Sequence, residues 1–290
     1  MAFCRLQQPA LRAPCATIEC MKIAGLQKLT LLDYPGKTAA TVFTPGCNFR
    51  CPFCHNADLI ALAADVGADD ATTASASASA GDASTPAEGL PSIPEDELFA
   101  FLGKRHGLLD GVCVTGGEPT LQPDLAQFCA RVKREGFAVK LDTNGTRPEA
   151  LHALLDAGLV DMVAMDVKNA PARYAETVGL PKDALRLDNV EASMRALLES
   201  PVPFEFRTTV VRELHAEDDL LAAARWIAHL TREAGRDAAD VPWFLQGFVD
   251  SESVLAGKGA FSPWDKNALR GILPALQAIL PQTALRGVNA

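Results

Sequence analysis

Six short apolar runs alternate along the chain with segments of helical periodicity, and this alternation limits the possible folds more than any other feature. Strands that alternate with helices form a parallel sheet with its helices outside. The sequence therefore predicts an α/β fold, either an open doubly wound sheet or an incomplete parallel barrel. The predicted strands are 39–43, 111–115, 137–142, 160–166, 203–211 and 241–248. The predicted helices are 95–105, 123–135, 148–157, 189–199, 216–234 and 263–280.

Two segments do not follow this alternation. Residues 62–92 consist almost entirely of Ala, Ser, Thr, Gly and Asp, which bury too little apolar surface to offset the entropy of ordering. We predict that they form a flexible insertion. Residues 1–20 carry prolines and scattered polar residues, and we predict a disordered tail. Met21 opens a more regular segment and is an alternative start of translation, which leaves 21–290 as one domain.

Composition and charge argue against several classes of protein. A formal net charge of −9 speaks against a basic surface that binds nucleic acid. The chain has no uninterrupted apolar run of the roughly 20 residues that a membrane-spanning helix needs, and its first residues lack the apolar stretch of a secretory signal. We therefore expect a cytoplasmic protein whose eight cysteines are reduced thiols or metal ligands.

Polar residues collect at the carboxyl ends of the predicted strands. Because the carboxyl ends of parallel strands meet at one edge of a sheet or barrel, we expect these residues to form a single active site. They come from five different strands and are Cys47, Gly116, Gly117, Glu118, Asp142, Thr143, Asn144, Gly145, Asp166, Lys168 and Arg207.

Three of the cysteines lie in one short loop, TPGCNFRCPFCHN, at Cys47, Cys51 and Cys54. A structural zinc site closes with four ligands, and the only candidate nearby, His55, follows Cys54 in an awkward position. The CxxCH pattern at 51–55 also matches c-type haem attachment, but that interpretation leaves Cys47 without a role. An iron–sulfur cubane held by three thiolates keeps one iron without a protein ligand, which opens it to chemistry.

The CxxxCxxC spacing, with Phe53 just before the last cysteine, resembles the cluster loop of the radical S-adenosylmethionine (SAM) enzymes. The run VTGGEPTLQ after the second predicted strand supports the resemblance, because Gly-Gly-Glu at this place is the superfamily's signature for holding the methionyl amino group. The resemblance implies an incomplete (βα)6 barrel of the radical SAM type, with the cluster loop after the first strand. It also implies that Cys47, Cys51 and Cys54 bind a [4Fe–4S] cluster whose open iron chelates SAM.

The resemblance assigns cofactor binding to residues at several strand ends. Glycines there let the backbone approach a ligand closely, and a carboxylate or carbonyl accepts a hydrogen bond from an ammonium group. The run DTNG at 142–145 also has the composition of a turn, so a structural role and a ligand role are both open. The expected cofactor-binding residues are Phe53, Gly116, Gly117, Glu118, Asp142, Thr143, Asn144, Lys168 and Arg207.

The charged residues on the fourth and fifth predicted strands allow two interpretations. In the first, Lys168 pairs with the carboxylate of SAM, while Asp166 points elsewhere or binds a cation beside Asp142. In the second, Lys168 and Asp166 form an internal ion pair. Arg207 lies in the apolar run PFEFRTTVV and needs a partner, for which a cofactor or substrate carboxylate is one candidate.

Longer runs are similar to the anaerobic ribonucleoside-triphosphate reductase activating proteins, which are related to pyruvate formate-lyase activating enzyme. This similarity, from residue 21 to about residue 248, implies that an electron from flavodoxin or ferredoxin drives reductive cleavage of SAM. The resulting 5′-deoxyadenosyl radical would take a glycine hydrogen from a partner, the reductase or a related glycyl-radical enzyme. The runs are GLQKLTLLDYPGK, CNFRCPFCHN, GLLDGVCVTGGEPTLQPDL, KLDTNG, GLVDMVAMDVK and EFRTTVV.

Two other functions share parts of this pattern. A radical SAM enzyme that acts on a small molecule would carry the same strand-end motifs and differ only in residues on the substrate side. An iron–sulfur protein for electron transfer or metal sensing would carry the cysteine loop and leave the Gly-Gly-Glu run unexplained. Without a second cysteine cluster in the sequence, we expect no auxiliary iron–sulfur centre.

Overall fold

The computed structural model of the chain describes residues 20–61 and 92–287. The predicted tail at 1–20 and the predicted insertion at 62–92 lie outside the described residues, apart from Cys20 and Ser92. Within these described ranges, no helix has both the length and the apolar character that crossing a bilayer requires.

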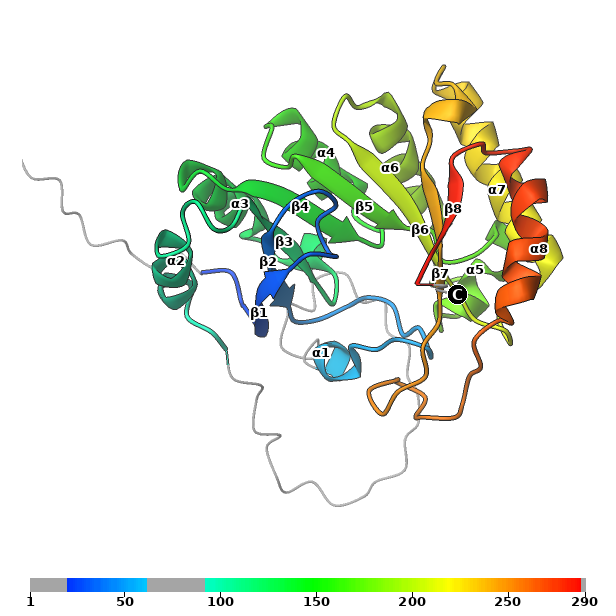
Figure 1. The fold of residues 1–290 in the computed structure, drawn as a ribbon, viewed down its shortest axis with the longest axis horizontal. Helices are drawn as coiled ribbons and strands as arrows, with labels where there is room; N and C mark the ends of the chain where they lie inside the picture. The colour runs from blue at the N-terminus through cyan, green and yellow to red at the C-terminus, as the bar shows by residue number, and fades with distance from the viewer. Residues whose placement is uncertain (1–19, 62–91, 288–290) are drawn as a thin grey trace, which may run out of the picture.

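One eight-stranded sheet in the order β1 to β8 forms the centre of the described structure (Figure 1). Neighbours from β2 to β8 pair in parallel, and β1 pairs antiparallel to β2. All the predicted strands form, as β2 to β7, which confirms the incomplete parallel barrel. The bounds are β1 Gly25–Thr30, β2 Ala39–Thr44, β3 Gly111–Gly116, β4 Ala138–Thr143, β5 Met162–Asp166, β6 Phe204–Val210, β7 Trp243–Gly247 and β8 Thr283–Arg286.

A long helix connects each pair of neighbouring parallel strands and lies on the outer side of the curved sheet (Figure 1). The last predicted helix begins later than expected, because the Asp265 carboxylate caps it by accepting from the N–H groups of Asn267 and Ala268 at 3.0 and 2.9 Å. The long helices are α2 Glu95–Gly103, α3 Leu125–Arg134, α4 Pro148–Asp156, α6 Leu187–Glu199, α7 Glu217–Glu233 and α8 Lys266–Gln277. Shorter pieces are α1 Ala57–Ala61, η2 Pro119–Leu121, η3 Pro171–Arg173, α5 Tyr174–Thr177 and η4 Ala238–Asp240.

Strand residues alternate between an apolar face under the helices and a polar face inside the barrel. In β4, Val139 and Leu141 are fully buried in the core that the helices cover. Lys140 and Asp142 project from the opposite face, because successive strand residues point to opposite sides. The parallel strands therefore appear in the sequence as apolar runs interrupted by single charges.

The structure adds two strands to the predicted set, one at each end of the sheet. β1 (GLQKLT) has no apolar run, and its residues 27–29 are exposed because it pairs on one side only. β8 has four residues, too few for a recognisable pattern. Arg286 secures β8 by donating two hydrogen bonds to the Glu205 carboxylate of β6, at 2.8 and 2.9 Å, and by covering the Phe244 ring of β7.

Replacing Arg286 by Met should lower the free energy of unfolding by about 3 kcal/mol, because it leaves the buried Glu205 carboxylate without its cation. Urea unfolding of the metal-free chain measures this loss. The matched control, Arg195→Met, removes an exposed ion pair with Glu233 and should cost less than about 1 kcal/mol. Equal, small losses for the two variants would contradict the role given to Arg286.

Candidate active site

The cysteine loop follows β2 at the carboxyl end of the parallel strands, and segments distant in sequence hold its backbone. The N–H of Arg50 donates to the Val178 carbonyl at 2.9 Å. From the loop after β7, the N–H of Leu255 donates to the Cys54 carbonyl, also at 2.9 Å. The path of the loop is therefore fixed by the surrounding protein.

One pocket at this end of the barrel is lined by every expected metal ligand and cofactor-binding residue, whereas Gly145, which the sequence analysis also placed at the site, does not line it. Its lining includes Cys47, Cys51, Phe53, Cys54, Gly116, Gly117, Glu118, Asp142, Thr143, Asn144, Asp166, Lys168 and Arg207. The structure thus brings together residues from five strand ends, as the parallel topology predicts. Their roles toward a cofactor remain predictions.

Backbone amides surround the thiols of the loop. The N–H of Phe49 donates to Cys47 Sγ and the N–H of Asn56 to Cys54 Sγ, each at 3.4 Å. Burial raises the pKa of the Cys47 thiol to about 11 and that of Cys51 to about 12, so without a cation both stay protonated at neutral pH. Three thiols, two of which accept a backbone N–H···S hydrogen bond, form a donor set that fits an iron–sulfur cluster.

The spread of the thiols also bears on the zinc alternative. Across residues 20–61 and 92–287, no three His, Cys, Asp or Glu side chains converge closely enough to hold one metal ion. Zinc gathers its ligands on a single ion, whereas a cubane binds each thiolate through a different iron. A single zinc ion would need three such side chains closer together than this structure has them.

Two glycines after β3 allow its loop to contact the cysteine loop directly. The N–H of Gly117 donates to the Thr44 carbonyl at 2.8 Å, and the N–H of Glu118 donates to the Gly46 carbonyl at 2.7 Å. A Cβ atom at Gly117 would lie 1.8 Å from the Gly46 oxygen, and Gly116 has a φ of +122°. The glycines are thus required by the contact between the two loops, whatever ligand they also approach.

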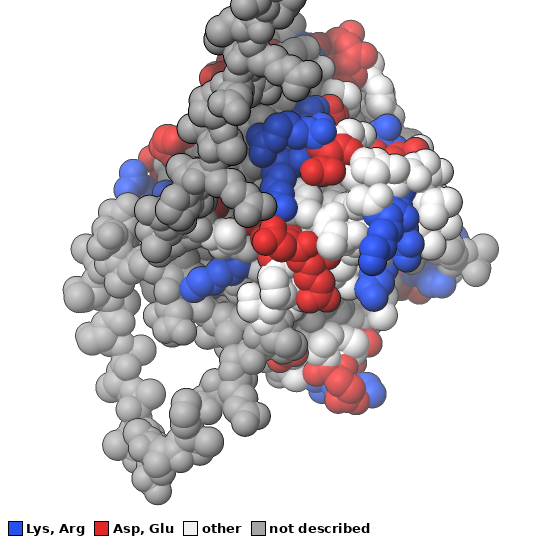
Figure 2. Space-filling model, turned by 90° about the vertical axis from the view of Figure 1, so that its left-hand side faces the viewer, with Lys and Arg blue, Asp and Glu red and all other residues white. Residues whose placement is uncertain are grey.

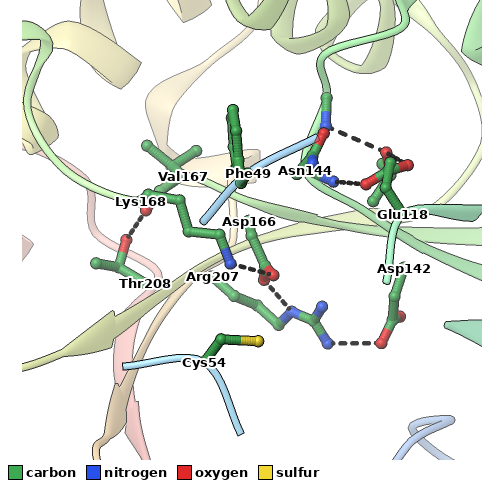
Figure 3. A network of polar contacts seen from close by, with 12 residues as sticks. Phe49, Cys54, Glu118, Asp142, Asn144, Asp166, Val167, Lys168, Arg207 and Thr208 are labelled. Carbon is green, nitrogen blue, oxygen red and sulfur yellow. Dashed lines mark hydrogen bonds and ion pairs between the residues drawn. The ribbon is translucent and has the colours of Figure 1, made fainter. Parts of the chain in front are cut away.

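The Glu118 carboxylate is buried and already fully hydrogen-bonded. It accepts from the N–H and hydroxyl of Thr120 at 3.1 and 2.5 Å and from the Thr143 hydroxyl at 2.7 Å. It also accepts from the Asn144 N–H at 2.6 Å (Figure 3). Burial raises the pKa of Glu118, and these donors counteract part of that effect. The side chain therefore ties the loop after β3 to the loop after β4.

Charged side chains of β4, β5 and β6, together with Lys168 just after β5, form one network, and all of them except Lys140 line the pocket (Figure 3). Arg207 contacts Asp142 at 3.1 Å and Asp166 at 3.0 Å, and Lys168 contacts Asp166 at 2.9 Å. Lys140, 1% exposed, pairs with the other oxygen of Asp142. Asp166 therefore does not point elsewhere, the internal Lys168–Asp166 pair is present, and Arg207 finds its partners within the protein.

The sequence analysis assigned no cofactor role to some residues of the pocket, and of these it had considered only His55, as a zinc ligand. Phe49, His55, Asn56, Ile60, Thr115 and Thr209 also line it. His215, in the loop after β6, is 1% exposed, and its Nε2 lies 2.8 Å from the Lys168 carbonyl oxygen. Its ring also packs edge-on against Phe53, so His215 supports two predicted site residues at once.

The charge network should make stability depend on pH through Asp166. Burial acts to raise the pKa of Asp166, but the charges of Arg207 and Lys168 outweigh it and lower the pKa to about 2. An unfolded Asp titrates near about 3.9, so the stabilisation is complete above that pH and is lost as the pH falls toward about 2.

Asp166→Asn should therefore remove about 1 kcal/mol of the stability change between about pH 5 and about pH 3. Urea unfolding of the metal-free chain at a series of pH values measures the slope. Asp183→Asn, at an exposed position without an ion pair among the described residues, is the control. An unchanged slope in Asp166→Asn would show that the network does not hold this carboxylate ionised.

Comparison with known proteins agrees with this geometry. The chain is 33% identical over 207 residues to a putative glycyl-radical enzyme activating enzyme of Methanocaldococcus jannaschii, covering 71% of this chain and 75% of that protein. It is 30% identical over 229 residues to a 7-carboxy-7-deazaguanine synthase of Methanopyrus kandleri, covering 76% of this chain and 83% of that protein. A radical SAM methyltransferase from Sphaerobacter thermophilus has a similar fold, with a TM-score of 0.60 at 16% identity over 89% of this chain and 68% of that chain. Residues 41–225 match the family described as the radical SAM superfamily, and the chain belongs to that superfamily.

Proposed function

We propose that the chain is a radical SAM activating enzyme that generates a glycyl radical on anaerobic ribonucleoside-triphosphate reductase or a related enzyme. The observation that carries this proposal is the 33% identity to a putative glycyl-radical enzyme activating enzyme, over most of both chains. The runs GLQKLTLLDYPGK and KLDTNG, which resemble the reductase-activating proteins, support the narrower choice of partner.

In this proposal Cys47, Cys51 and Cys54 would hold a [4Fe–4S] cluster with one iron free of protein ligands. The fit rests on their three thiols and the N–H···S hydrogen bonds around them. When bound, the cluster supplies an electron that cleaves SAM to methionine and the 5′-deoxyadenosyl radical, the agent that abstracts the glycine hydrogen. The protein's own part is to hold SAM in one orientation and to exclude water.

The methionyl amino group of SAM would be bound by backbone carbonyls at Gly116 and Gly117. Glu118 is a less suitable acceptor, because its two oxygens already accept four hydrogen bonds and the side chain is 1% exposed. Glu118 then acts as a positioning residue, which fixes the glycine loop against Thr143 and Asn144.

The carboxylate of SAM would pair with the charge network. Lys140, Lys168 and Arg207 carry three positive charges against the two of Asp142 and Asp166, which leaves one positive charge unbalanced. Among the cations of the network, Lys168 and Arg207 line the pocket with the cysteine loop, and the charge of Lys168 acts to lower the pKa of the Cys51 thiol, against the larger effect of burial. We assign Lys168 the SAM carboxylate and treat the other charges as its supports.

The proposal also includes an electron donor, a cellular compartment and a class of partner. Flavodoxin or ferredoxin would supply the electron, and the cytoplasm would provide the reducing setting that unpaired thiols need. The net charge of −9 agrees with a protein partner and offers no support for a nucleic acid.

A small-molecule substrate is the second candidate. The 7-carboxy-7-deazaguanine synthase of Methanopyrus kandleri aligns over 76% of this chain and 83% of its own length, so overall chain length does not separate the two functions. An electron-transfer or sensor protein is the third candidate, and it leaves the glycine loop and the charge network without a use.

Transfer of a labelled hydrogen tests the proposal. Anaerobic ribonucleoside-triphosphate reductase from the same organism is prepared with deuterium at the Cα of its glycines and mixed with the reconstituted, reduced chain and SAM. We expect deuterium in 5′-deoxyadenosine and a glycyl radical signal in the electron paramagnetic resonance spectrum. Turnover of SAM without label transfer, together with consumption of a metabolite, would instead support the small-molecule function.

Cys51→Ala should abolish reductive formation of 5′-deoxyadenosine, because the remaining two thiols of the loop do not hold the cluster. Chromatographic quantification after reduction with dithionite measures the product. Cys129→Ala is the matched control: this fully buried thiol lies in α3, outside the pocket, and its loss should leave the yield unchanged. A normal yield of 5′-deoxyadenosine from Cys51→Ala would contradict the assignment of the cluster to this loop.

A further inference from the structure

Four exposed leucines lie at the end of the barrel opposite the candidate site. Leu29, Leu31, Leu32 and Leu108 have exposed fractions of 57%, 67%, 86% and 65%. They lie at the end of β1, in the loop that follows it, and in the loop before β3, all near the amino-terminal ends of the parallel strands. We call these four residues the leucine patch.

Hydrogen bonds join the two loops that carry the leucine patch. The Thr38 hydroxyl, just before β2, donates to the Leu108 carbonyl at 3.1 Å. The Thr38 N–H donates to the Asp110 carboxylate at 2.8 Å. These hydrogen bonds therefore hold the loop before β2 against the loop before β3, although the two are 70 residues apart in sequence.

Four basic residues lie on the segments that carry the leucine patch or directly beside them in sequence, and we call them the basic rim: Lys28, Lys37, Lys104 and Arg105. Lys28 and Arg105 both lie over the ring of Phe101 in α2, at 6.0 and 4.9 Å from its centroid, and Lys37 lies over the ring of Tyr34 at 5.7 Å. Within residues 20–61 and 92–287, none of the four forms an ion pair. Figure 2 shows one side of the molecule, where groups of basic and of acidic side chains lie beside uncharged surface.

The basic rim stands out because the chain as a whole carries a net charge of −9. Two acids lie in this region and both are hydrogen-bonded within the protein: one carboxylate oxygen of Asp110 accepts two hydrogen bonds from Thr38, and Asp33 accepts one from the Thr41 hydroxyl. Exposed apolar side chains ringed by charges of one sign mark an interaction site, and the matching surface carries the opposite charge. The complement here is an acidic surface with apolar side chains at its centre.

We propose that the leucine patch and the basic rim dock an acidic protein surface, and that this surface belongs to the enzyme whose glycine is activated. The second half of the proposal rests on the proposed function. A symmetric pair of this chain fits less well, because a twofold contact would bring the two basic rims together. Lys28, in the middle of the edge strand β1, also opposes pairing of that edge with another copy.

Docking at this surface would act on the barrel interior through one loop. Asp33, directly after Leu32, accepts a hydrogen bond from the Thr41 hydroxyl of β2 at 2.6 Å. Thr41 pairs with Cys113 of β3, whose side chain lies by Lys140 of the charge network. A partner bound to Leu31 and Leu32 therefore touches the loop that enters the barrel.

Two double variants test the proposal: Leu31→Ser with Leu32→Ser, and Lys28→Glu with Arg105→Glu. The probe is the anaerobic ribonucleoside-triphosphate reductase of the same organism, titrated against the reconstituted chain. Each variant should bind it about tenfold more weakly, and the charge variant should also lose salt dependence. Formation of 5′-deoxyadenosine without the reductase should stay unchanged, because neither double variant alters the pocket.

Arg270→Glu is the matched control, since Arg270 is exposed on α8 at the opposite side of the molecule from α2 (Figure 1). Equal urea midpoints for all variants show that each one folds. If the wild-type chain takes label from the reductase and the variants bind it normally, the docking proposal fails and the function stands. If the wild-type chain neither binds the reductase nor takes label from it, both fail. A change in the oligomeric state of the chain alone, with normal reductase binding, assigns the surface to a second copy and overturns the proposal.

Discussion

The close approach of two backbones at Gly46 and Gly117 determines the geometry of the candidate site. The Gly46 carbonyl accepts from the N–H of Glu118 at 2.7 Å, and a Cβ atom on Gly117 would collide with that carbonyl. The Glu118 carboxylate in turn accepts hydrogen bonds from the Thr143 hydroxyl and the Asn144 N–H, and so links this contact to the loop after β4. One tight contact thus aligns the loops after β2, β3 and β4, and any ligand held between them depends on it.

The barrel interior imposes the second constraint, because several ions share it. An isolated charge there would be very unfavourable, and the protein avoids that by alternating signs from Lys140 through Asp142, Arg207 and Asp166 to Lys168. Each carboxylate contacts two cations, so removing one cation leaves each carboxylate paired with at least one other, whereas removing Asp142 or Asp166 leaves Lys140 or Lys168 without an ion pair in the described part of the chain. The network ends on the positive charge of Lys168 beside the cysteine loop, where an anionic group of a ligand would complete the alternation.

Much of this arrangement follows from the sequence. Strands β2 to β7 were predictable because burial on both sides requires apolar runs, and parallel topology gathers their polar ends at one edge. The Lys168–Asp166 pair was one of two interpretations of the sequence, whereas the partners of Glu118 and Arg207 come from other strands and were not predictable. The strand β8 and the support from His215 also depend on contacts between distant segments, and no local pattern encodes them.

The two ends of the barrel differ in what their side chains contact. The carboxyl ends of the strands carry a polar pocket that must stay rigid, so its loops are fastened to one another by buried hydrogen bonds. The amino-terminal ends carry the leucine patch, where apolar side chains remain in contact with water at a cost that only binding recovers. A parallel barrel keeps these two tasks apart, so a docking surface can change for a new partner while the pocket is preserved. The Asp33 loop is the exception, because it belongs to the docking surface and enters the interior. It is therefore the element through which a bound protein would first affect the pocket.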